Sequence, residues 1–355
     1  MNYRELGATG LRVSTVALGT MTFGGLGGFK PVGSTDVETA KRLVSMCVQH
    51  GVNLIDTANI YSAGLAEEIL GQALAGHRDE VYIATKVGLH TGNGPNQGGC
   101  SRCYIISQCE ESLRRLQTDH IDLYQLHRWD GITALDETLG ALADLVHTGK
   151  VRYVGCSNYS AWHLMKAIGV AERHRFPRFA SQQIHYSLQA REAEYELLPA
   201  AVDQRLGSLI WSPLAGGLLS GKYRRHAQAP LGSRHTIGWS EPPVYDRERL
   251  YDIIDVLVKI ADKREASPAR VALAYVLGRP GVTSVVVGAR TEEQFLDNLG
   301  AAELELEPAE LADLDSVSAP PLIYPYWHQA KTLGDRLSSA DAVLHGPRSA
   351  SAEPQ

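Results

Sequence analysis

Four polar side chains in the sequence could together carry out proton transfer. Asp56, Tyr61, Lys86 and His127 each stand at, or shortly after, the end of a short apolar run. A phenol has an ordinary pKa of about 10, too high for easy proton transfer at neutral pH, and a neighbouring ammonium lowers it. We expect Lys86 to supply that charge, Asp56 to keep the lysine charged and oriented, and His127 to hydrogen-bond a substrate oxygen or the phenol. A carbonyl beside Tyr61 and His127 would then be polarised for attack by a hydride.

Each of these residues also has an ordinary structural interpretation. Asp56 could cap a helix, Tyr61 could be a half-buried aromatic residue, and Lys86 could be solvated. His127 could be a hydrogen-bonded core histidine. Four such residues at equivalent positions of successive runs make coincidence the weaker explanation, so we favour the catalytic hypothesis.

A hydride donor of the nucleotide type needs a site for its phosphates, and residues 210–222 (IWSPLAGGLLSGK) are one candidate. Glycines there let backbone N–H groups approach a pyrophosphate, and Lys222 adds positive charge. Trp211 offers a ring on which a nicotinamide could stack. An ordinary flexible loop is an equal alternative for this segment alone.

A second candidate anion site follows the last predicted strand. Arg290 stands just before the N-terminus of a predicted helix, where phosphate binds well. Gln294 and Asn298 are four residues apart, on one face of that helix.

These residues need a fold that brings distant segments together, and the alternation of short apolar runs with longer helical segments supplies one. Six of the seven steps between successive runs are 27 to 40 residues long, near one βα unit, and the seventh is 75. Eight units predict an α/β fold of the (β/α)8 TIM-barrel type, in which functional groups gather at the carboxyl ends of the strands. The predicted strands are residues 16–18, 54–56, 81–83, 121–123, 151–154, 180–184, 208–210 and 283–287.

Further elements flank this barrel. Residues 3–13, with Gly7 and Gly10 at the turn, look like an N-terminal β-hairpin that plugs the bottom of the barrel. We expect a single barrel domain over residues 1–320 and a C-terminal tail over residues 321–355, whose end can be disordered.

Local signals mark several helix boundaries. The spacing of Thr35 and Glu38 predicts a capping box. Ser267 followed by Pro268 predicts an N-cap with proline in the first helical position. A further helix is predicted over residues 247–263.

Composition narrows the class of protein. The 355 residues contain 34 Lys+Arg and 40 Asp+Glu, which gives a net charge of -6 and disfavours a nucleic-acid partner. The adjacent pairs Arg114–Arg115 and Arg224–Arg225 are more typical of solvated faces. Hydrophobic residues make up 44%, ordinary for a globular protein with a large core.

The sequence predicts neither a signal peptide nor a membrane span. Residues 1–13 contain no apolar segment of signal-peptide length, and stretches such as 271–277 fall far short of the ~18 apolar residues of a membrane span. We therefore expect a cytoplasmic, soluble protein with no membrane partner.

The cysteines do not form a disulfide framework in a chain of this length. Cys100 and Cys103 form a CxxC pair that could be half of a zinc site, but no second half follows. We favour structural or incidental thiols over zinc or redox use, and predict no metal. The five cysteines are Cys47, Cys100, Cys103, Cys109 and Cys156.

From about residue 3 to about residue 302, the chain resembles an aldo-keto reductase, because separate motifs fall in order on separate predicted strands. The general GxGxxG fingerprint follows none of these strands, as that family would have it, so a Rossmann domain is disfavoured. The segments that carry the resemblance are 51–58 with Tyr61 and Glu68-x-x-Gly71, Thr85-Lys86, Leu126-His127, 155–158, Gln183-x-x-Tyr186, 211–214, and Gly288-x-Arg290-x-x-x-Gln294-x-x-x-Asn298.

The resemblance implies the same catalytic roles as the residues themselves, with Tyr61 as general acid, and it implies NADPH/NADP+ as cofactor. It places Ser157, Asn158 and Gln183 at the nicotinamide carboxamide, with Trp211 stacked on the ring. Arg290 would bind the adenosine 2′-phosphate, favouring NADPH over NADH, and Gln294 and Asn298 the adenine end. The implied cofactor contacts are Gly19, Thr20, Met21, Asp56, Ser157, Asn158, Gln183, Trp211, Ser212, Leu214, Gly216, Lys222, Gly288, Arg290, Gln294 and Asn298.

Loops would shape the substrate pocket. The long Gly/Pro/His-rich stretch 215–243 is predicted to be a functional loop over the barrel mouth. Aromatic residues in these loops could line an apolar or sugar-stacking pocket, or simply pack on the barrel rim. The candidate loops are 88–103, 128–130, 226–245 and 324–327.

We compare three functions that the sequence could support. The leading hypothesis is NADPH-dependent reduction of an aldehyde or ketone, such as a keto-sugar or another small carbonyl substrate, to the alcohol. The alternative is a nicotinamide-binding regulatory subunit, similar to the β subunits of potassium channels, with little turnover. A barrel glycosidase needs paired carboxylates, whereas only Asp56 is acidic among the assigned strand ends. The sequence makes no prediction of oligomeric state.

Overall fold

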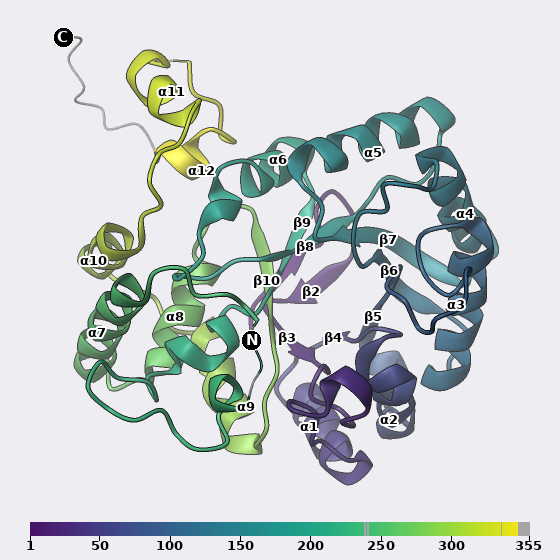
Figure 1. Cartoon of the computed structure of the whole chain (residues 1–355), viewed down its shortest axis with the longest axis horizontal. Helices are drawn as coiled ribbons and strands as arrows, with labels where there is room; N and C mark the ends of the chain where they lie inside the picture. Colours follow the sequence, from purple (N-terminus) through teal and green to yellow (C-terminus); the bar gives the residue numbers. More distant parts are fainter. Residues whose placement is uncertain (238, 240, 335, 347–355) are drawn as a thin grey trace.

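Eight parallel strands close into a barrel at the centre of the molecule, with helices around it (Figure 1). The computed structural model describes residues 1–237, 239, 241–334 and 336–346. All eight predicted strands are confirmed, and so is the TIM-barrel fold. In barrel order they are β10 (Val282–Val287), β3 (Val16–Gly19), β4 (Leu54–Asp56), β5 (Tyr82–Val87), β6 (Ile121–Leu126), β7 (Val151–Ser157), β8 (Ser181–His185) and β9 (Gly207–Trp211).

The register of the barrel sets the predicted site residues beside one another. Parallel neighbours end at the same side of a sheet, so polar residues that close successive strands meet at one mouth. The Cα partners at this mouth include Gly19 with Asp56, Ser157 with Gln183, and His185 with Trp211.

Helices follow the strands and cover the outside of the barrel (Figure 1). Their buried faces are aliphatic, as in α7, where Leu250, Ile253, Ile254 and Leu257 are buried. The helices that follow the strands are α1 (Val37–Gln49), α2 (Leu65–Ala73), α3 (Arg102–Leu116), α4 (Leu135–His147), α5 (Ala161–His174), α6 (Leu197–Gln204), α7 (Arg247–Lys263), α8 (Pro268–Leu277), α9 (Glu292–Leu299) and α10 (Pro308–Ser318).

One of the two predicted helix starts is confirmed and the other is wrong. The Ser267 side chain accepts a hydrogen bond from the Arg270 N–H, and Pro268 is the first helical residue. At α1 the N-cap is Asp36, whose side chain accepts from the Thr39 N–H, so there is no capping box from Thr35. Thr35 is instead buried in a β-bridge with Phe23, which leaves the next residue to cap the helix.

The predicted N-terminal hairpin is confirmed as β1 (Tyr3–Glu5) and β2 (Arg12–Ser14), paired antiparallel. Its buried side chains, including Leu6, share a core cluster with Leu54 and Leu209 of the barrel strands, so the hairpin closes one end of the barrel. Gly7 has φ +64°, and a Cβ there would lie 2.6 Å from the Arg205 carbonyl oxygen, so only glycine allows this close packing.

The C-terminal tail contains two short helices, α11 (Tyr326–Thr332) and α12 (Ala342–His345). In Figure 1, α11 stands away from the barrel beyond α6 and α10. The Tyr326 ring stacks on Tyr195, with centroids 5.2 Å apart, and ties this segment to the barrel. The predicted end of the tail, residues 347–355, lies outside the described residues, and the division at residue 320 stays a prediction.

Short 3-10 helices and a long connection complete the mouth. Between β9 and α7 the chain forms η5 (Ala215–Ser220) and η6 (Arg234–Thr236). The other short helices are η1 (Gly27–Phe29), η2 (Tyr61–Gly64), η3 (Arg78–Glu80), η4 (Glu192–Glu194) and η7 (Gly300–Ala302).

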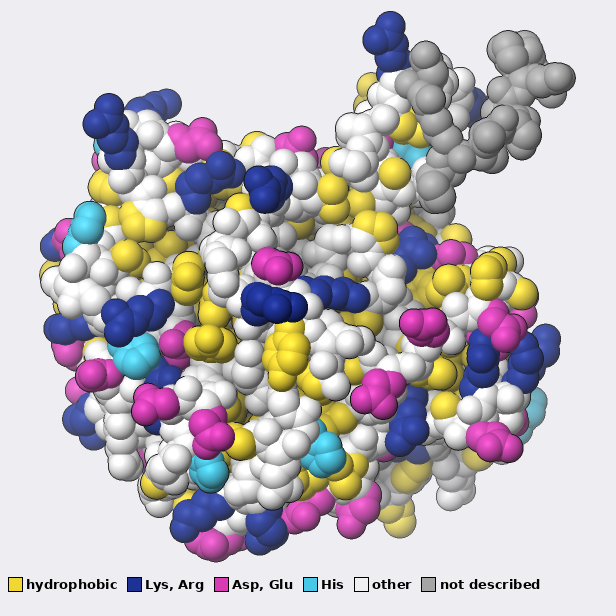
Figure 2. Space-filling view, turned by 180° about the vertical axis from the view of Figure 1, so that it is seen from behind, with side chains coloured by type: hydrophobic (Ala, Val, Ile, Leu, Met, Phe, Trp, Pro, Cys, Tyr) yellow, Lys and Arg dark blue, Asp and Glu magenta, His cyan; other side chains and the backbone are white. Residues whose placement is uncertain are grey.

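Charges of both signs are interspersed over the face of the molecule shown in Figure 2. Among the described residues, no helix is both long enough and apolar enough to cross a membrane.

Candidate active site

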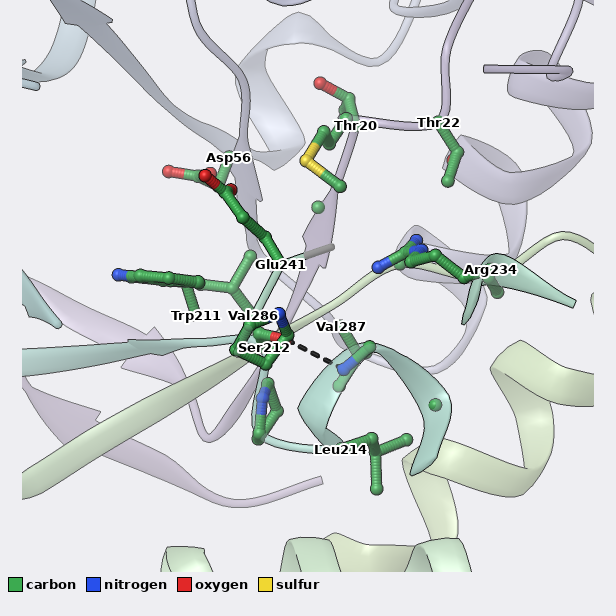
Figure 3. A pocket seen from close by; sticks show the side chains of 18 of the residues that line it. Thr20, Thr22, Asp56, Trp211, Ser212, Leu214, Arg234, Glu241, Val286 and Val287 are labelled. Atoms are coloured by element: carbon green, nitrogen blue, oxygen red, sulfur yellow. Dashed lines mark hydrogen bonds between the residues drawn. The ribbon is translucent and has the colours of Figure 1, made fainter. Parts of the chain in front are cut away.

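A cavity of about 750 Å³ opens at the carboxyl ends of the barrel strands (Figure 3). Every residue predicted above to be catalytic or to contact cofactor lines it, except Lys86. The long connection between β9 and α7 contributes Gly216, Gly217, Ser220, Lys222, Arg234, Trp239, Glu241 and Pro242. The structure therefore brings the predicted residues to one place, although they are spread over more than two hundred positions of the sequence.

Lys86 lies at the centre of the site, immediately beneath the cavity. Its side chain is fully buried, and Nζ donates to Asp56 Oδ2 (2.6 Å), the Thr57 carbonyl oxygen (2.8 Å) and Tyr61 Oη (3.3 Å). These contacts use all three ammonium protons. Asp56 and Tyr61 line the cavity above it, so the lysine acts on the cavity through these two side chains.

The charge state of Lys86 follows from the balance of burial and neighbours. Burial by itself would lower the pKa of Lys86, but the Asp56 carboxylate and the Tyr61 hydroxyl raise it above its ordinary value. Lys86 therefore stays protonated, as the sequence suggests. The second oxygen of Asp56 accepts from Gln183 Nε2 (2.7 Å), which fixes the carboxylate in this orientation.

Tyr61 departs from the sequence-based expectation in its acidity. Burial raises the pKa of Tyr61 above its ordinary value, and the opposing effect of Lys86 is smaller. The lysine acts in the expected direction, yet burial outweighs it. A phenol with a raised pKa is fully protonated at neutral pH, so Tyr61 holds a proton that it can donate.

His127 stands beside this group, with its ring centroid 6.0 Å from that of Tyr61 and an edge-on orientation. Burial, followed by the charges of Lys86 and Arg128, lowers the pKa of His127 well below its usual range. The imidazole is therefore neutral. The His127 ring lines the cavity and can bind a substrate oxygen there. Its Nδ1 is buried without a hydrogen-bond partner among the described residues.

These pKa directions predict a flat pH profile for the chemical step. Because the pKa of His127 is lowered and that of Tyr61 is raised, neither group titrates between about pH 6 and about pH 9. We expect the single-turnover rate of carbonyl reduction to change less than about twofold over that range. Stopped-flow measurements on the protein and on His127→Gln test this. A loss of rate toward acid with a midpoint near 6.5, absent from His127→Gln, would show that His127 titrates normally.

The polar groups at the ends of β7 and β8 form a hydrogen-bonded chain. Ser157 Oγ and the Asn158 N–H both donate to the Gln183 carbonyl oxygen (2.9 and 3.1 Å). Asn158 has φ +55°, and its side chain joins Trp211 to the His127 carbonyl oxygen. The amide groups predicted to hold a carboxamide therefore lie together, with Asn158 directly linked to both Trp211 and His127.

Trp211 is held by His185, which is not among the residues predicted from the sequence. The His185 ring stacks against it, with centroids 4.6 Å apart and planes 26° apart. The two are register partners on β8 and β9, and burial lowers the pKa of His185 to about 4, so the ring is neutral. Period-two alternation from Gln183 places His185 on the same face of β8 and could have identified it.

Three cations gather at the other part of the cavity. Burial, followed by Arg290 and Arg234, lowers the pKa of Lys222, and burial followed by Arg290 lowers the pKa of Arg234. No ion pair among the described residues joins any of the three to a carboxylate. Clustered cations without a counter-ion fit a bound anion. Arg234 was missed because its loop position carries no motif.

The backbone beside these cations is shaped as a cradle. Gly216 and Gly217 have φ of +65° and +94°, and the Gly216 N–H donates to Ser212 Oγ (3.0 Å, the dashed line in Figure 3). A Cβ on Gly216 would lie 2.9 Å from His235, and one on Gly217 would lie 3.1 Å from Lys222. The glycines therefore allow side chains and a ligand to approach the backbone closely. Together the cradle, the cations and Trp211 fit a dinucleotide with phosphates at one end and a planar ring at the other.

The loops predicted to form the substrate pocket divide into two groups. Leu89, Trp239 and Glu241, from loops 88–103 and 226–245, line the cavity. The predictions for 128–130 and 324–327 are wrong, since none of these residues lines it. Trp129 instead stacks on His163, with centroids 4.1 Å apart, because α5 brings that ring against it on the outside of the barrel.

The two cysteines of the CxxC pair lie in different surroundings. Cys100 is buried, which raises its pKa to about 12, and Cys103 is exposed on α3. Among the described residues, no group of histidine, cysteine and acidic side chains is arranged to hold a metal ion.

The chain belongs to the aldo/keto reductase family, whose model matches residues 15–319. It is 41% identical over 336 residues to an uncharacterized oxidoreductase, YrpG, of Bacillus subtilis, covering 89% of this chain and 96% of that protein. It is 36% identical to a probable voltage-gated potassium channel subunit beta of Arabidopsis thaliana (86% and 92% covered) and 34% identical to Protein tas of Escherichia coli (89% and 97%). The protein is thus an oxidoreductase of a family that generally reduces carbonyl groups with a nicotinamide cofactor.

Proposed function

We propose that the protein reduces an aldehyde or ketone to the alcohol with NADPH, and that Tyr61 is the general acid. The observation that carries this proposal is the contact of buried Lys86 Nζ with Asp56 and Tyr61, which line one cavity together with a neutral His127. A protonated phenol next to a buried ammonium is suited to protonating an oxygen that becomes negative during reduction.

Each residue has a distinct task in this mechanism. His127 donates a hydrogen bond to the carbonyl oxygen and makes the carbonyl carbon more electrophilic. Tyr61 Oη gives its proton to that oxygen, and the Lys86 ammonium stabilises the phenolate that remains. Asp56 keeps Lys86 charged. Bound NADPH would supply the hydride.

The cofactor would be held along the length of the cavity. Trp211, backed by His185, would contact the nicotinamide, and the amide groups at the ends of β7 and β8 would bind its carboxamide. The cradle of Gly216 and Gly217 with Lys222 would bind phosphate. Arg290 lies directly before the N-cap of α9, Thr291, and is suited to the 2′-phosphate that distinguishes NADPH from NADH.

Arg290→Ala should therefore weaken the binding of NADPH far more than the binding of NADH. Losing a charge-assisted contact to a phosphate costs about 1.5–3 kcal/mol, so we expect the Kd of NADPH to rise roughly 10- to 100-fold. The Kd of NADH should change by less than about threefold, because NADH lacks that phosphate. Fluorescence titration with both nucleotides measures this. Arg12→Ala, an exposed arginine on β2, is the control. If the variant weakened the binding of both nucleotides equally, Arg290 would not bind the 2′-phosphate.

The alternative function is that of a nicotinamide-binding regulatory subunit with little turnover. It is favoured by the 36% identity to a protein named a probable potassium channel subunit beta. A titration with NADPH and NADH, followed by a panel of aldehydes, diketones and keto-sugars, separates the two functions. Turnover of a carbonyl at rates above ~1 per second supports the reductase, and tight binding without turnover supports the regulatory subunit.

A further inference from the structure

Three aromatic rings form a wall at the catalytic end of the cavity. The Phe29 ring of η1 lies edge-on to Tyr61 (centroids 5.4 Å apart) and tilted against Trp239 of the mouth loop (6.2 Å). All three residues line the cavity. Aromatic faces attract cations and pack against the apolar faces of hydroxylated rings, so this wall can hold the non-reacting part of a substrate.

A carboxylate completes this wall. Glu241 lines the same cavity, and Figure 3 shows its side chain extending toward the strand end that carries Asp56. Its negative charge reaches Tyr61, where it adds to the rise in the pKa of the hydroxyl. Among the described residues, no lysine, arginine or histidine forms an ion pair with Glu241. Unlike Asp56, whose charge is matched by Lys86, it is free to pair with a ligand.

The cavity is therefore electrically divided. The charges that act on Tyr61 are those of Lys86, Asp56 and Glu241. Apart from burial, the pKa of Lys222 is instead lowered by the charges of Arg290 and Arg234, and the pKa of Arg234 by the charge of Arg290. One part of the cavity thus suits phosphates, and the part beside Tyr61 suits a group that donates hydrogen bonds or carries positive charge.

We propose that Glu241 and the wall of Phe29, Tyr61 and Trp239 select carbonyl substrates whose non-reacting part is a hydrogen-bond donor, hydroxylated or cationic, and reject carboxylates such as keto acids. This rests on the proposed function, because it assigns a substrate class to the same cavity. A hydroxyl or ammonium group can donate to the Glu241 oxygens while its carbon skeleton packs on the rings. A substrate carboxylate beside Glu241 would instead meet a like charge.

The test uses four benzaldehydes that differ only in the para group: dimethylaminomethyl (cationic at neutral pH), hydroxymethyl, methoxymethyl and carboxymethyl. The measured quantity is kcat/KM for each, expressed relative to the methoxymethyl compound within the same variant. Dissociation constants of the same compounds, from quenching of tryptophan fluorescence in the presence of NADP+, give a second readout that needs no turnover.

In the wild type we expect the cationic aldehyde to exceed the carboxymethyl aldehyde by roughly tenfold, the size of effect for two charges several ångströms apart in a partly solvated site. Glu241→Gln should reduce that ratio to about twofold, and Glu241→Lys should reverse it. Glu305→Gln, which removes an exposed carboxylate that does not line the cavity, should leave the ratio at its wild-type value.

The outcomes separate the possibilities. If Glu241→Gln lowers the relative kcat/KM of the cationic aldehyde alone, the site selects a cationic substrate. If it lowers the relative kcat/KM of the hydroxymethyl aldehyde as well, the site selects a hydroxylated one. Unchanged ratios in Glu241→Gln, in both rate and binding, overturn the proposal. Binding that follows the expected order without turnover of any aldehyde would refute the proposed reductase function while supporting this assignment of Glu241.

Discussion

Tyr61→Phe is expected to lower the rate of carbonyl reduction about 10³-fold, within the range that general acid catalysis contributes. The variant loses only the hydroxyl that Lys86 Nζ contacts at 3.3 Å. The ring itself remains to pack against Phe29 and His127. The Kd of NADPH should therefore change by less than about twofold. Single-turnover kinetics with saturating NADPH measure the rate of the chemical step directly.

A matched Tyr→Phe change elsewhere serves as the control. Tyr326→Phe removes a hydroxyl that bonds Glu196 on the surface of the tail, and it should retain the wild-type rate. A Tyr61→Phe variant that kept the wild-type single-turnover rate would contradict our assignment of the acid. A variant that lost NADPH binding as well would indicate that Tyr61 acts mainly in shaping the cavity.

Lys86→Met is expected to be the most damaging substitution in the site for stability. It leaves the buried Asp56 carboxylate without its counter-ion, and breaking such a pair costs about 3–5 kcal/mol of unfolding free energy. The reduction rate should fall about 10²-fold or more, because the Tyr61 phenolate would lose the ammonium that stabilises it. Urea unfolding and single-turnover kinetics measure the two effects.

The double variant Asp56→Asn/Lys86→Met separates these effects. Removing both charges should recover most of the lost stability, because no unpaired charge remains buried. It should not recover activity, since the ammonium is still absent. A Lys86→Met protein as stable as the wild type would mean that Asp56 finds another partner or takes up a proton at neutral pH.

The barrel could be predicted because its period is regular. Strands such as β4 and β10 are short apolar runs followed by helical segments, and the polar residues that end them must meet at one mouth. Asp56, Lys86 and His127 could be identified on that geometric ground alone. The predicted cap of α1 was wrong by one residue, because Thr35 forms a β-bridge with Phe23 and Asp36 caps the helix instead.

Other features depend on how far a side chain is buried and on contacts between loops. The raised pKa of Tyr61 reflects its burial, which the residue's position in the sequence does not reveal. Arg234 joins Lys222 and Arg290 only because the long connection after β9 folds back over the cavity. Trp129 stacks on His163 of α5 and does not line the cavity. These features emerge from packing between segments that have no common motif.

The most direct test of the proposed reductase follows the hydride itself. The purified protein would be incubated with NADPH deuterated at the transferable position and an aromatic aldehyde, and the alcohol would be analysed by mass spectrometry. We expect an alcohol that carries deuterium on the carbinol carbon, formed in equal amount to the NADPH consumed. Tight binding of NADPH with no deuterated alcohol, across aldehydes and ketones of different size and charge, would contradict the proposed function.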